Sequence, residues 1–259
     1  MKTHSKTHII IPARYKSTRL AGKPLCEIHG KPMVLWTAQK ALKATFADSM
    51  CVATDDERIF KVCQNADIPV VMTGEHASGT DRLGEVAQIL DLADDDIVIN
   101  MQGDEPLVPP VLLEQVKDLL LKNTDCVMAT LCEVIDNFED FYKNSVVKVV
   151  KAGNQALYFS RSPIPYDRDG VLKNELGGMP QNAFRHLGLY AYRVKLLKTF
   201  HQWQQGELEK LESLEQLRIL ENGHKIAIDV AKLVLPLGVD THDDLVRLNA
   251  MPIDDFLKF

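Results

Sequence analysis

A cluster of basic residues follows the first predicted strand. Arg14, Lys16, Arg19 and Lys23 lie within ten residues that contain no acidic side chain, directly after the apolar run Ile9–Ile11. Arginine binds phosphate oxygens in a bidentate manner, and small residues between the cations let backbone N–H groups approach an anion. A solvated basic loop is the alternative, but it does not explain why the cations follow a buried strand. The segment therefore predicts a phosphate site, although it lacks the glycine-rich nucleotide signatures.

Acidic residues follow two other predicted strands. Asp104 and Glu105 come after the strand Ile97–Asn100, and Asp240 comes after a strand predicted over Leu233–Val239. Carboxylates at the carboxyl edge of an open α/β sheet suit Mg²⁺, which binds one or two of them together with substrate phosphates. Helix capping is the alternative for both motifs.

A polar loop from Glu75 to Arg82 leads into another predicted helix. Its Ser78, Gly79 and Arg82 have the size and the hydrogen-bonding groups to recognise the edge of a base. An ordinary helix-capping turn is the alternative.

Two segments of the second half place polar groups beside apolar ones. In the predicted strand 185–192, alternation puts His186 and Tyr190 on one face and apolar side chains on the other. In the predicted helix 207–222, Glu215 lies inside an apolar arc, where an unpaired carboxylate is costly. The alternatives are a buried structural histidine and an ion pair between the glutamate and an arginine three residues later. The functional interpretation is that both segments hold a polar ligand.

Composition excludes several classes of protein. The 259 residues are 46% hydrophobic and 25% charged, which is typical of a globular chain and excludes collagen-like or wholly disordered ones. The net charge of −6 argues against a general nucleic-acid binder. Apolar runs are too short to span a membrane, and the polar first residues lack the apolar core of a secretory signal, so we expect a cytoplasmic protein. Five cysteines without zinc spacing predict reduced, buried thiols.

Strands and helices must alternate to position these side chains. Strands are predicted over 9–11, 50–53, 70–72 and 97–100, and helices over 34–42, 56–65, 81–92 and from 109 onward. This alternation is typical of parallel strands joined by crossover helices, so the sequence predicts an α/β sheet. After it, a hairpin is predicted from 146–150 to 156–159, and a capping box at Thr241 and Asp244 begins the last helix.

Ten short motifs in one order resemble the 3-deoxy-manno-octulosonate cytidylyltransferases, also called CMP-Kdo synthetases. The motifs are Ile-Pro-Ala-Arg (11–14), Gly-Lys-Pro-Leu (22–25), Ala-Thr-Asp (53–55), Ser-Gly-Thr (78–80), Gln-Gly-Asp-Glu-Pro (102–106), Leu-Tyr-Phe-Ser-Arg (157–161), Pro-Tyr-Asp-Arg (165–168), Arg-His-Leu-Gly (185–188), Leu-Glu-Gln-Leu-Arg (214–218) and Gly-Val-Asp-Thr (238–241). The resemblance runs from about Ile9 to Leu248. Ala21 departs from it, because the family usually has proline before Gly22, and this change removes neither a charge nor a donor.

The resemblance implies a fold and a reaction. The fold would be a Rossmann-like, mixed and mostly parallel sheet, in a single nucleotidyltransferase domain over 1–259. A hairpin-containing lobe at about 140–200 would bind sugar and form a homodimer contact. The reaction would transfer CMP from CTP to the anomeric C2 hydroxyl of Kdo with Mg²⁺, releasing pyrophosphate. Its product would enter lipopolysaccharide synthesis in the cytoplasm of Gram-negative bacteria.

The resemblance also suggests residue roles, which we state as hypotheses. The catalytic residues would be Arg14, Lys23 and Asp104, and the metal ligands would be Asp104 and Asp240. The residues that contact CTP would be Ala13, Arg14, Ser17, Arg19, Lys23, Ser78, Gly79, Arg82 and Gln102. The residues that contact the sugar would be Arg161, His186, Tyr190, Glu215 and Gln216. Arg161 would pair with the Kdo carboxylate. His186 is expected to bind sugar, with general-base catalysis as its alternative.

Three other functions stay open at this point. Another acidic sugar as the acceptor, such as 8-amino-Kdo or sialic acid, is the first alternative. A glycosyltransferase of similar fold is a second alternative, although a free triphosphate explains the basic cluster better than a nucleotide sugar does. A non-catalytic nucleotide-binding module is the third, and the two acids Asp104 and Asp240 argue against it.

Overall fold

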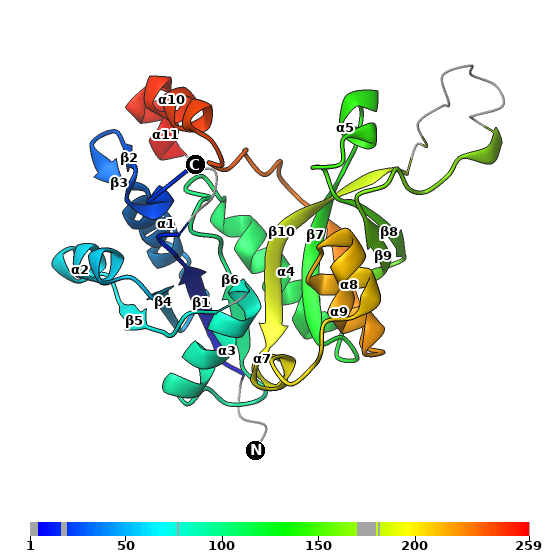
Figure 1. The fold of residues 1–259 in the computed structure, drawn as a ribbon, viewed down its shortest axis with the longest axis horizontal. Helices are drawn as coiled ribbons and strands as arrows, with labels where there is room; N and C mark the ends of the chain where they lie inside the picture. The colour runs from blue at the N-terminus through cyan, green and yellow to red at the C-terminus, as the bar shows by residue number, and fades with distance from the viewer. Residues whose placement is uncertain (1–4, 17–19, 77, 170–179, 181, 259) are drawn as a thin grey trace.

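A nine-stranded mixed sheet forms the centre of the protein in the computed structural model, which describes residues 5–16, 20–76, 78–169, 180 and 182–258. The strands follow the order β5-β4-β1-β6-β10-β7-β11-β9-β8 (Figure 1). Their bounds are β1 Thr7–Pro12, β4 Ser49–Thr54, β5 Val70–Met72, β6 Ile97–Asn100, β7 Met128–Val134, β8 Lys148–Ala152, β9 Gln155–Ser160, β10 Phe184–Arg193 and β11 Ile226–Val230. A two-stranded ribbon joins β2 (Glu27–Ile28) to β3 (Lys31–Pro32).

Parallel pairing dominates the first half, as the sequence predicts. β1 pairs in parallel with β4 and β6, and β4 pairs in parallel with β5. β10 then runs antiparallel between β6 and β7, and β11 is parallel to β7. The carboxyl ends of β1, β4, β5, β6 and β11 therefore lie on one edge of the sheet.

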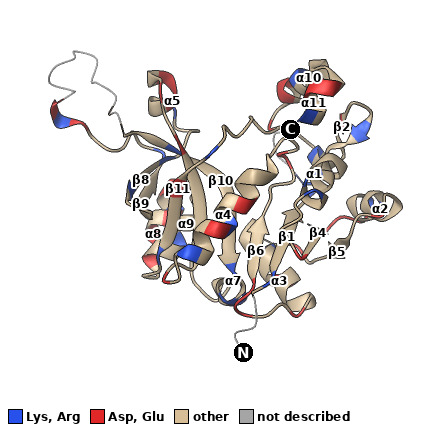
Figure 2. Ribbon diagram, turned by 180° about the vertical axis from the view of Figure 1, so that it is seen from behind, with Lys and Arg blue, Asp and Glu red and all other residues tan. Residues whose placement is uncertain are grey.

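Helices cover both faces of this sheet. Their bounds are η1 Lys23–Leu25, α1 Met33–Leu42, α2 Glu57–Asn65, α3 Gly79–Ile89, α4 Pro110–Lys122, α5 Phe138–Tyr142, α7 Val194–Phe200, α8 Glu207–Glu212, α9 Gln216–Glu221, α10 His242–Ala250 and α11 Ile253–Lys258. One core cluster joins α1, α2 and α4 to one face, and a second joins α3, α7 and α9 to the other. Ile9 and Ile11 enter the first cluster and Ile10 the second, because neighbouring residues of a strand point to opposite faces. Figure 2 shows charged residues on the outer helices and mostly uncharged central strands.

The chain returns to its first half at the end. α10 and α11 pack beside α1 and the small ribbon, where the Phe256 and Trp36 rings lie 4.9 Å apart. The predicted capping box is confirmed, with Thr241 as the N-cap of α10 and Asp244 as its partner. This return carries the segment before α10, including Asp240, to the carboxyl edge of the sheet.

Two predicted elements are wrong. The helix predicted over 207–222 is broken into α8 and α9 at Ser213, whose φ of 51° is left-handed. Leu211, which lies one turn before Glu215 in the apolar arc of that predicted helix, is 80% exposed. The strand predicted over Leu233–Val239 is a segment without strand pairing, in which Leu235 and Val239 are buried and Val234 is exposed.

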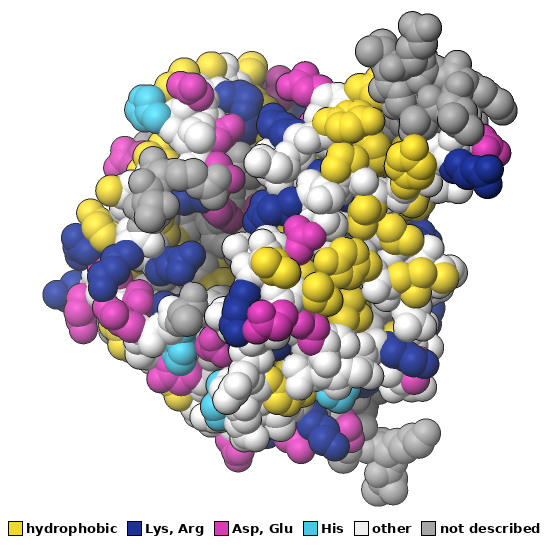
Figure 3. All heavy atoms as spheres, turned by 45° about the vertical axis from the view of Figure 1, so that its right-hand side comes forward, with side chains coloured by type: hydrophobic (Ala, Val, Ile, Leu, Met, Phe, Trp, Pro, Cys, Tyr) yellow, Lys and Arg dark blue, Asp and Glu magenta, His cyan; other side chains and the backbone are white. Residues whose placement is uncertain are grey.

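The hairpin lobe carries exposed hydrophobic side chains. The predicted hairpin is confirmed as β8 and β9, joined by a turn with Gly153 at a φ of 56°. Phe138, Tyr142, Leu157 and Tyr166 are all exposed. Figure 3 shows hydrophobic side chains gathered on this side of the molecule. Among the helices of the described residues, none has the length and apolarity that crossing a bilayer requires.

Candidate active site

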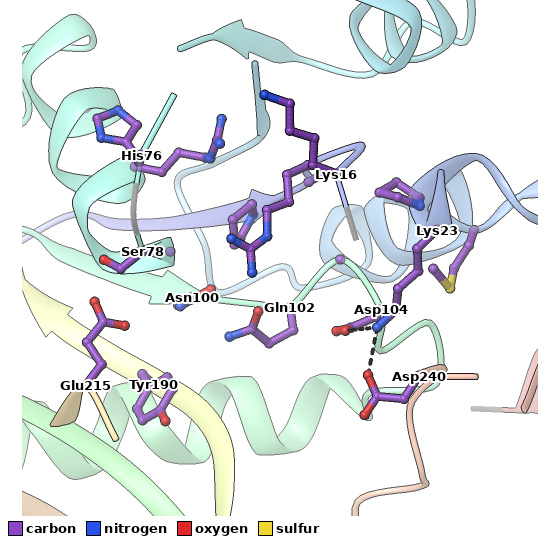
Figure 4. A pocket seen from close by; sticks show the side chains of 18 residues that line it. Lys16, Lys23, His76, Ser78, Asn100, Gln102, Asp104, Tyr190, Glu215 and Asp240 are labelled. Carbon is purple, nitrogen blue, oxygen red and sulfur yellow. Dashed lines mark hydrogen bonds and ion pairs between the residues drawn. The ribbon is translucent and has the colours of Figure 1, made fainter. Parts of the chain in front are cut away.

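A cleft of about 490 Å³ opens at the carboxyl edge of the sheet. Its lining comprises Pro12, Ala13, Arg14, Lys16, Lys23, Pro24, Met33, His76, Ser78, Gly79, Arg82, Asn100, Gln102, Gly103, Asp104, Tyr190, Glu215 and Asp240. Figure 4 shows two distinct ends. We call the end with Lys23, Asp104 and Asp240 the charged end, and the end with Asn100, Tyr190 and Glu215 the aromatic end.

Lys23 lies between two carboxylates at the charged end. Its Nζ atom is 2.5 Å from Asp104 Oδ2 and 2.9 Å from Asp240 Oδ1 (Figure 4). The preceding Gly22 fixes the approach, because its φ is 65° and a Cβ there would lie 2.9 Å from the Tyr15 ring. Only glycine adopts this conformation without strain, so the loop turns tightly and directs Lys23 into the cleft.

Backbone contacts bring the two acids together from distant parts of the chain. The Val239 N–H donates to the Asp104 carbonyl at 2.9 Å, and a Cβ on Gly238 would lie 2.9 Å from the same oxygen. Neither acid serves as a helix N-cap: α4 begins after Pro109 without a side-chain cap, and Thr241 caps α10. The helix-capping alternative is therefore wrong for both.

Glu105, beside Asp104, adds no negative charge at neutral pH. Burial, reinforced by the charge of Asp104, raises the pKa of its carboxyl to about 8. The charged end is thus a cluster of two carboxylates and one ammonium ion rather than three carboxylates and one.

The donor set at the charged end fits a magnesium ion. Asp104 and Asp240 already converge on one cation, the Lys23 ammonium. The part of the chain that the structure describes contains no group of three or more His, Cys, Asp or Glu side chains arranged to hold a metal. Mg²⁺ typically takes one or two protein carboxylates and completes its octahedron with water and substrate phosphates. The two acids suit that coordination.

The predicted base-recognition loop lines the cleft, and its groups also bond one another. Ser78 caps α3 by accepting from the Asp81 N–H at 3.1 Å, so the capping alternative describes its hydroxyl. Arg82 is buried and donates to Thr73 Oγ1 at 2.5 Å and to Asp55 Oδ2 at 2.9 Å. Gly79 has open space around its Cα. The arginine thus ties the ends of β4 and β5 to α3 beside the cleft.

Buried polar atoms at the aromatic end have no partner. Asn100 Oδ1, Glu215 Oε1 and Gln216 Nε2 are buried without a hydrogen-bond partner among the described residues. Burial raises the pKa of the Glu215 carboxyl, which the hydroxyls of Ser78 and Thr80 partly oppose. The predicted alternative for Glu215 is wrong, because Arg218 pairs with Glu209 instead, at 2.6 Å. Buried polar groups in proteins are usually hydrogen-bonded, so these atoms are available to a polar ligand or an ordered water.

His186 lies next to the aromatic end, within a row of rings. Its ring is 4.8 Å from that of Phe159 and 5.4 Å from that of Tyr190. Its Nε2 atom is 3.0 Å from Thr130 Oγ1, which lies within 3.0 Å of the carbonyls of Leu187 and Leu189. Because the hydroxyl gives its single proton to a carbonyl, Nε2 must be the donor to Thr130. Burial lowers the pKa of His186 to about 3, so the ring is neutral.

The remaining predicted residues divide into three groups. Ala13, Arg14 and Gln102 line the cleft. Gln216 lines a small cavity behind it, together with Tyr190 and Glu215. Arg161 is not in the cleft lining; its guanidinium donates to two backbone carbonyls at the corner between α8 and α9 and to the carbonyl of Asn144.

The sequence analysis left some lining residues without a role, and two predicted ones cannot be placed. Ser17 and Arg19 lie outside the described residues. His76 lines the cleft and bonds Glu85 at 2.5 Å, and Asn100 ends β6. Lys16 pairs with Glu75 at 2.5 Å across two lining loops. Only their position in the sequence could have identified these residues as part of the site, because each lies at or shortly after the end of a strand.

Comparisons with known proteins agree with this geometry. A cytidylyltransferase family model matches residues 8–226. The 3-deoxy-manno-octulosonate cytidylyltransferase of Psychrobacter sp. (strain PRwf-1) is 62% identical, with 96% of this chain and 95% of the relative covered. That of Acinetobacter baumannii (strain ATCC 17978) is 56% identical, with 96% and 99% covered.

Solved structures show the same fold. A CMP:2-keto-3-deoxy-manno-octonic acid synthetase complexed with CTP superposes with a TM-score of 0.87 at 39% identity, over 97% of this chain and 100% of the other. A 4-diphosphocytidyl-2C-methyl-D-erythritol synthase from Anaerococcus prevotii, at 13% identity and a TM-score of 0.61, covers 95% of each chain and shares the fold alone. The predicted mixed α/β fold is confirmed, and the chain belongs to the cytidylyltransferase family, among its 3-deoxy-manno-octulosonate cytidylyltransferases.

Proposed function

We propose that the cleft transfers CMP from CTP to the C2 hydroxyl of Kdo, releasing pyrophosphate and forming CMP-Kdo for lipopolysaccharide synthesis. The names of the relatives state the reaction, and one observation supports the same reaction for this chain. Lys23, Asp104 and Asp240 meet at one point of the cleft, although they come from distant segments. Nucleotidyl transfer needs positioning and charge neutralisation rather than a protein nucleophile, and this cluster supplies both signs of charge.

The two ends of the cleft take the two substrates. Arg14 and Lys23 neutralise the phosphates, and Gln102, Ser78 and Gly79 face the base. In the reaction, the C2 hydroxyl loses its proton to solvent and its oxygen bonds to the α-phosphorus. The bond from the α-phosphorus to the oxygen that bridges it to the β-phosphate breaks, and pyrophosphate leaves. Asp104 and Asp240 would hold Mg²⁺, which when bound stabilises charge on the α-phosphate and lowers the pKa of the attacking hydroxyl.

The sugar lies at the aromatic end in this proposal. Its hydroxyls satisfy the free polar atoms of Asn100, Glu215 and Gln216. His186 donates to Thr130 and offers its other nitrogen as an acceptor, so it binds rather than abstracts a proton; a base with a pKa near 3 is weak. His186→Ala should then raise KM for the sugar, whereas loss of a base would lower kcat by about 10²–10⁴.

The test is pyrophosphate release from CTP and Mg²⁺ with Kdo, 8-amino-Kdo and sialic acid in parallel. We expect the highest kcat/KM with Kdo. A preference for another sugar would contradict the assignment of the acceptor, and release with none of them would contradict nucleotidyl transfer. Omission of the metal, with a chelator present, tests the metal site separately and should abolish turnover.

We further propose a cytoplasmic homodimer. All five cysteines are free, which suits a reducing compartment. Phe138 and Tyr142 stack with ring centroids 6.4 Å apart on α5, and Leu157 is exposed on β9. Exposed apolar side chains gathered on one face favour an interface. Light scattering should give twice the mass of the chain, and Phe138→Asp with Leu157→Asp should halve it; a monomeric parent protein would contradict the proposal.

A further inference from the structure

The corner between α8 and α9 is held by the end of β9. Arg161 Nε donates to the Glu212 carbonyl at 2.7 Å, and Nη2 donates to the Ser213 carbonyl at 3.4 Å. In return, the Glu212 carboxylate accepts from Ser160 Oγ at 2.5 Å and from the Arg161 N–H at 2.8 Å. Ser160, the last residue of β9, and Arg161 directly after it thus bond both the backbone and a side chain of the corner.

These contacts explain why the helix ends at the corner, although the sequence pattern predicts that it continues. The last carbonyls of a helix have no intrahelical partner, and a cationic side chain at that end satisfies them and favours the helix dipole. Arg161 provides this for α8. Ser213 has a left-handed φ of 51°, a strained conformation that a residue with a Cβ adopts only when its surroundings impose it.

The helices on either side of the corner form one unit. Glu209 of α8 pairs with Arg218 of α9, and Glu221 at the end of α9 accepts from the Leu208 and Glu209 N–H groups at the start of α8. Glu215, the N-cap residue of α9, follows the corner by two residues and lines the cleft. Its place therefore depends on where the corner is tied to the sheet.

We propose that Arg161 is a positioning residue that sets Glu215 in the cleft through the α8–α9 corner, and does not itself contact the acceptor sugar. The inference rests on the proposed function, in which Glu215 binds that sugar. All three guanidinium nitrogens of Arg161 already donate to carbonyls, including Nη1 to Asn144 at 3.1 Å. An arginine held in this way orders a backbone rather than waiting for a carboxylate.

A double-mutant cycle tests the inference. Arg161→Ala should raise KM for the sugar about tenfold, as expected for the loss of one or two hydrogen bonds to the ligand, and leave KM for CTP unchanged. In a Glu215→Gln background the same change should add nothing, because the residue through which it acts is already altered. Glu212→Gln should reproduce the Arg161→Ala profile, since it loosens the same corner.

Arg193→Ala is the matched control. Arg193 also caps a helix, donating to the carbonyls of Leu120 and Cys126 at 3.1 Å, but it lies at the opposite end of β10 from the cleft. We expect it to lower the melting temperature without changing KM for the sugar. If the Arg161 and Glu215 effects multiply, Arg161 contacts the sugar directly and the inference is overturned.

Hydrogen exchange separates this inference from the proposed function. Amides of Leu214, Leu217 and Arg218 bond within the corner and α9, so they should exchange faster in Arg161→Ala than in the parent protein. Unchanged exchange there would overturn the clamp even in an active enzyme. Faster exchange in Arg161→Ala, combined with a parent protein that does not use Kdo, would instead contradict the proposed substrate and support the clamp.

Discussion

At the charged end of the cleft, Lys23 bonds both Asp104 and Asp240, and one buried oxygen, Glu105 Oε2, has no partner among the described residues. At the aromatic end three buried polar atoms have none, two of them in residues that line the cleft and one in a small cavity behind it. The charged end carries full charges, which cannot be left unpaired at an acceptable cost, and its own lysine balances the acids until substrate arrives. The aromatic end carries neutral amides and one carboxyl with a raised pKa, whose desolvation costs less.

The two ends of the cleft therefore differ in what a substrate must displace when it binds. A nucleotide triphosphate must compete with an existing ion pair, so its phosphates have to draw Lys23 away from the acids. In the proposed function, the sugar completes hydrogen bonds that the fold leaves open at the aromatic end. We therefore expect substitutions at the charged end to act on turnover, and substitutions at the aromatic end to act on sugar binding.

The largest effect is expected from Asp104→Asn. It removes one of the two carboxylates that suit a divalent ion, so kcat should fall by at least about 10³ while KM for the sugar changes little. Pyrophosphate release with saturating CTP measures it. Glu105→Gln is the matched control, because that neighbouring side chain is buried and its carboxyl carries no charge at neutral pH; it should retain most activity. Equal losses in both variants would contradict the special position of Asp104.

Lys23→Met should break the charged end in a second way. Removal of the phosphate-neutralising ammonium should lower kcat/KM for CTP by about 10²–10³. At the same time it leaves two carboxylates without their internal counter-ion, so Mn²⁺ should bind more tightly in the absence of nucleotide. Electron paramagnetic resonance titration measures that affinity. Lys16→Met, which alters an exposed lysine paired with Glu75, should leave it unchanged. Weaker Mn²⁺ binding in Lys23→Met would show that the lysine does not compete with the metal.

Glu215→Gln tests the cost of a buried carboxyl at the aromatic end. The pKa of Glu215 is raised, so its neutral form is favoured by folding; its contribution to stability is full below the unfolded pKa near 4.5 and is lost as pH rises. An uncharged amide should remove this loss, and the melting temperature at pH 8 should rise while KM for the sugar rises about tenfold. Glu209→Gln, which weakens a buried pair with Arg218, should instead lower the melting temperature. A fall in both variants would contradict the cost assigned to Glu215.

How far the sequence predicts the molecule also differs between its two halves. The buried strand β6, over Ile97–Asn100, and the half-buried edge strand β5, over Val70–Met72, have the predicted bounds, because both are short apolar runs that local sequence defines. The corner at Ser213 was missed, since its cap comes from Arg161, 51 residues from Glu212 in the chain. The segment Leu233–Val239 has a strand-like composition but does not pair with the sheet, and no local pattern reports that.

The candidate site shows the same division. The end of β6 correctly predicted the place of Asp104, and the basic loop after β1 that of Lys23. Asp240 was predicted at the same edge from a strand that does not form; the return of the chain before α10 brings it there instead. The sequence did not predict that the lysine would lie between the acids, because the distance between a side chain and its partner is a tertiary property. It also placed Glu215 within a helix, whereas the break after α8 is what directs Glu215 to the cleft.

The smallest effect tests that break directly. In a continuous helix, Leu211 would share a buried face with the residues one turn on, and its loss would be costly. In the broken arrangement Leu211 is 80% exposed, while Leu214 is 6% exposed and packs in the second core cluster. Leu211→Gln should therefore change the free energy of unfolding by no more than about 0.5 kcal/mol, and Leu214→Ala should lower it by about 2–4 kcal/mol. Urea denaturation measures both. Similar losses in the two variants would indicate a continuous helix instead. In that case the helix itself, and not the contacts of Arg161 with the corner, would position Glu215.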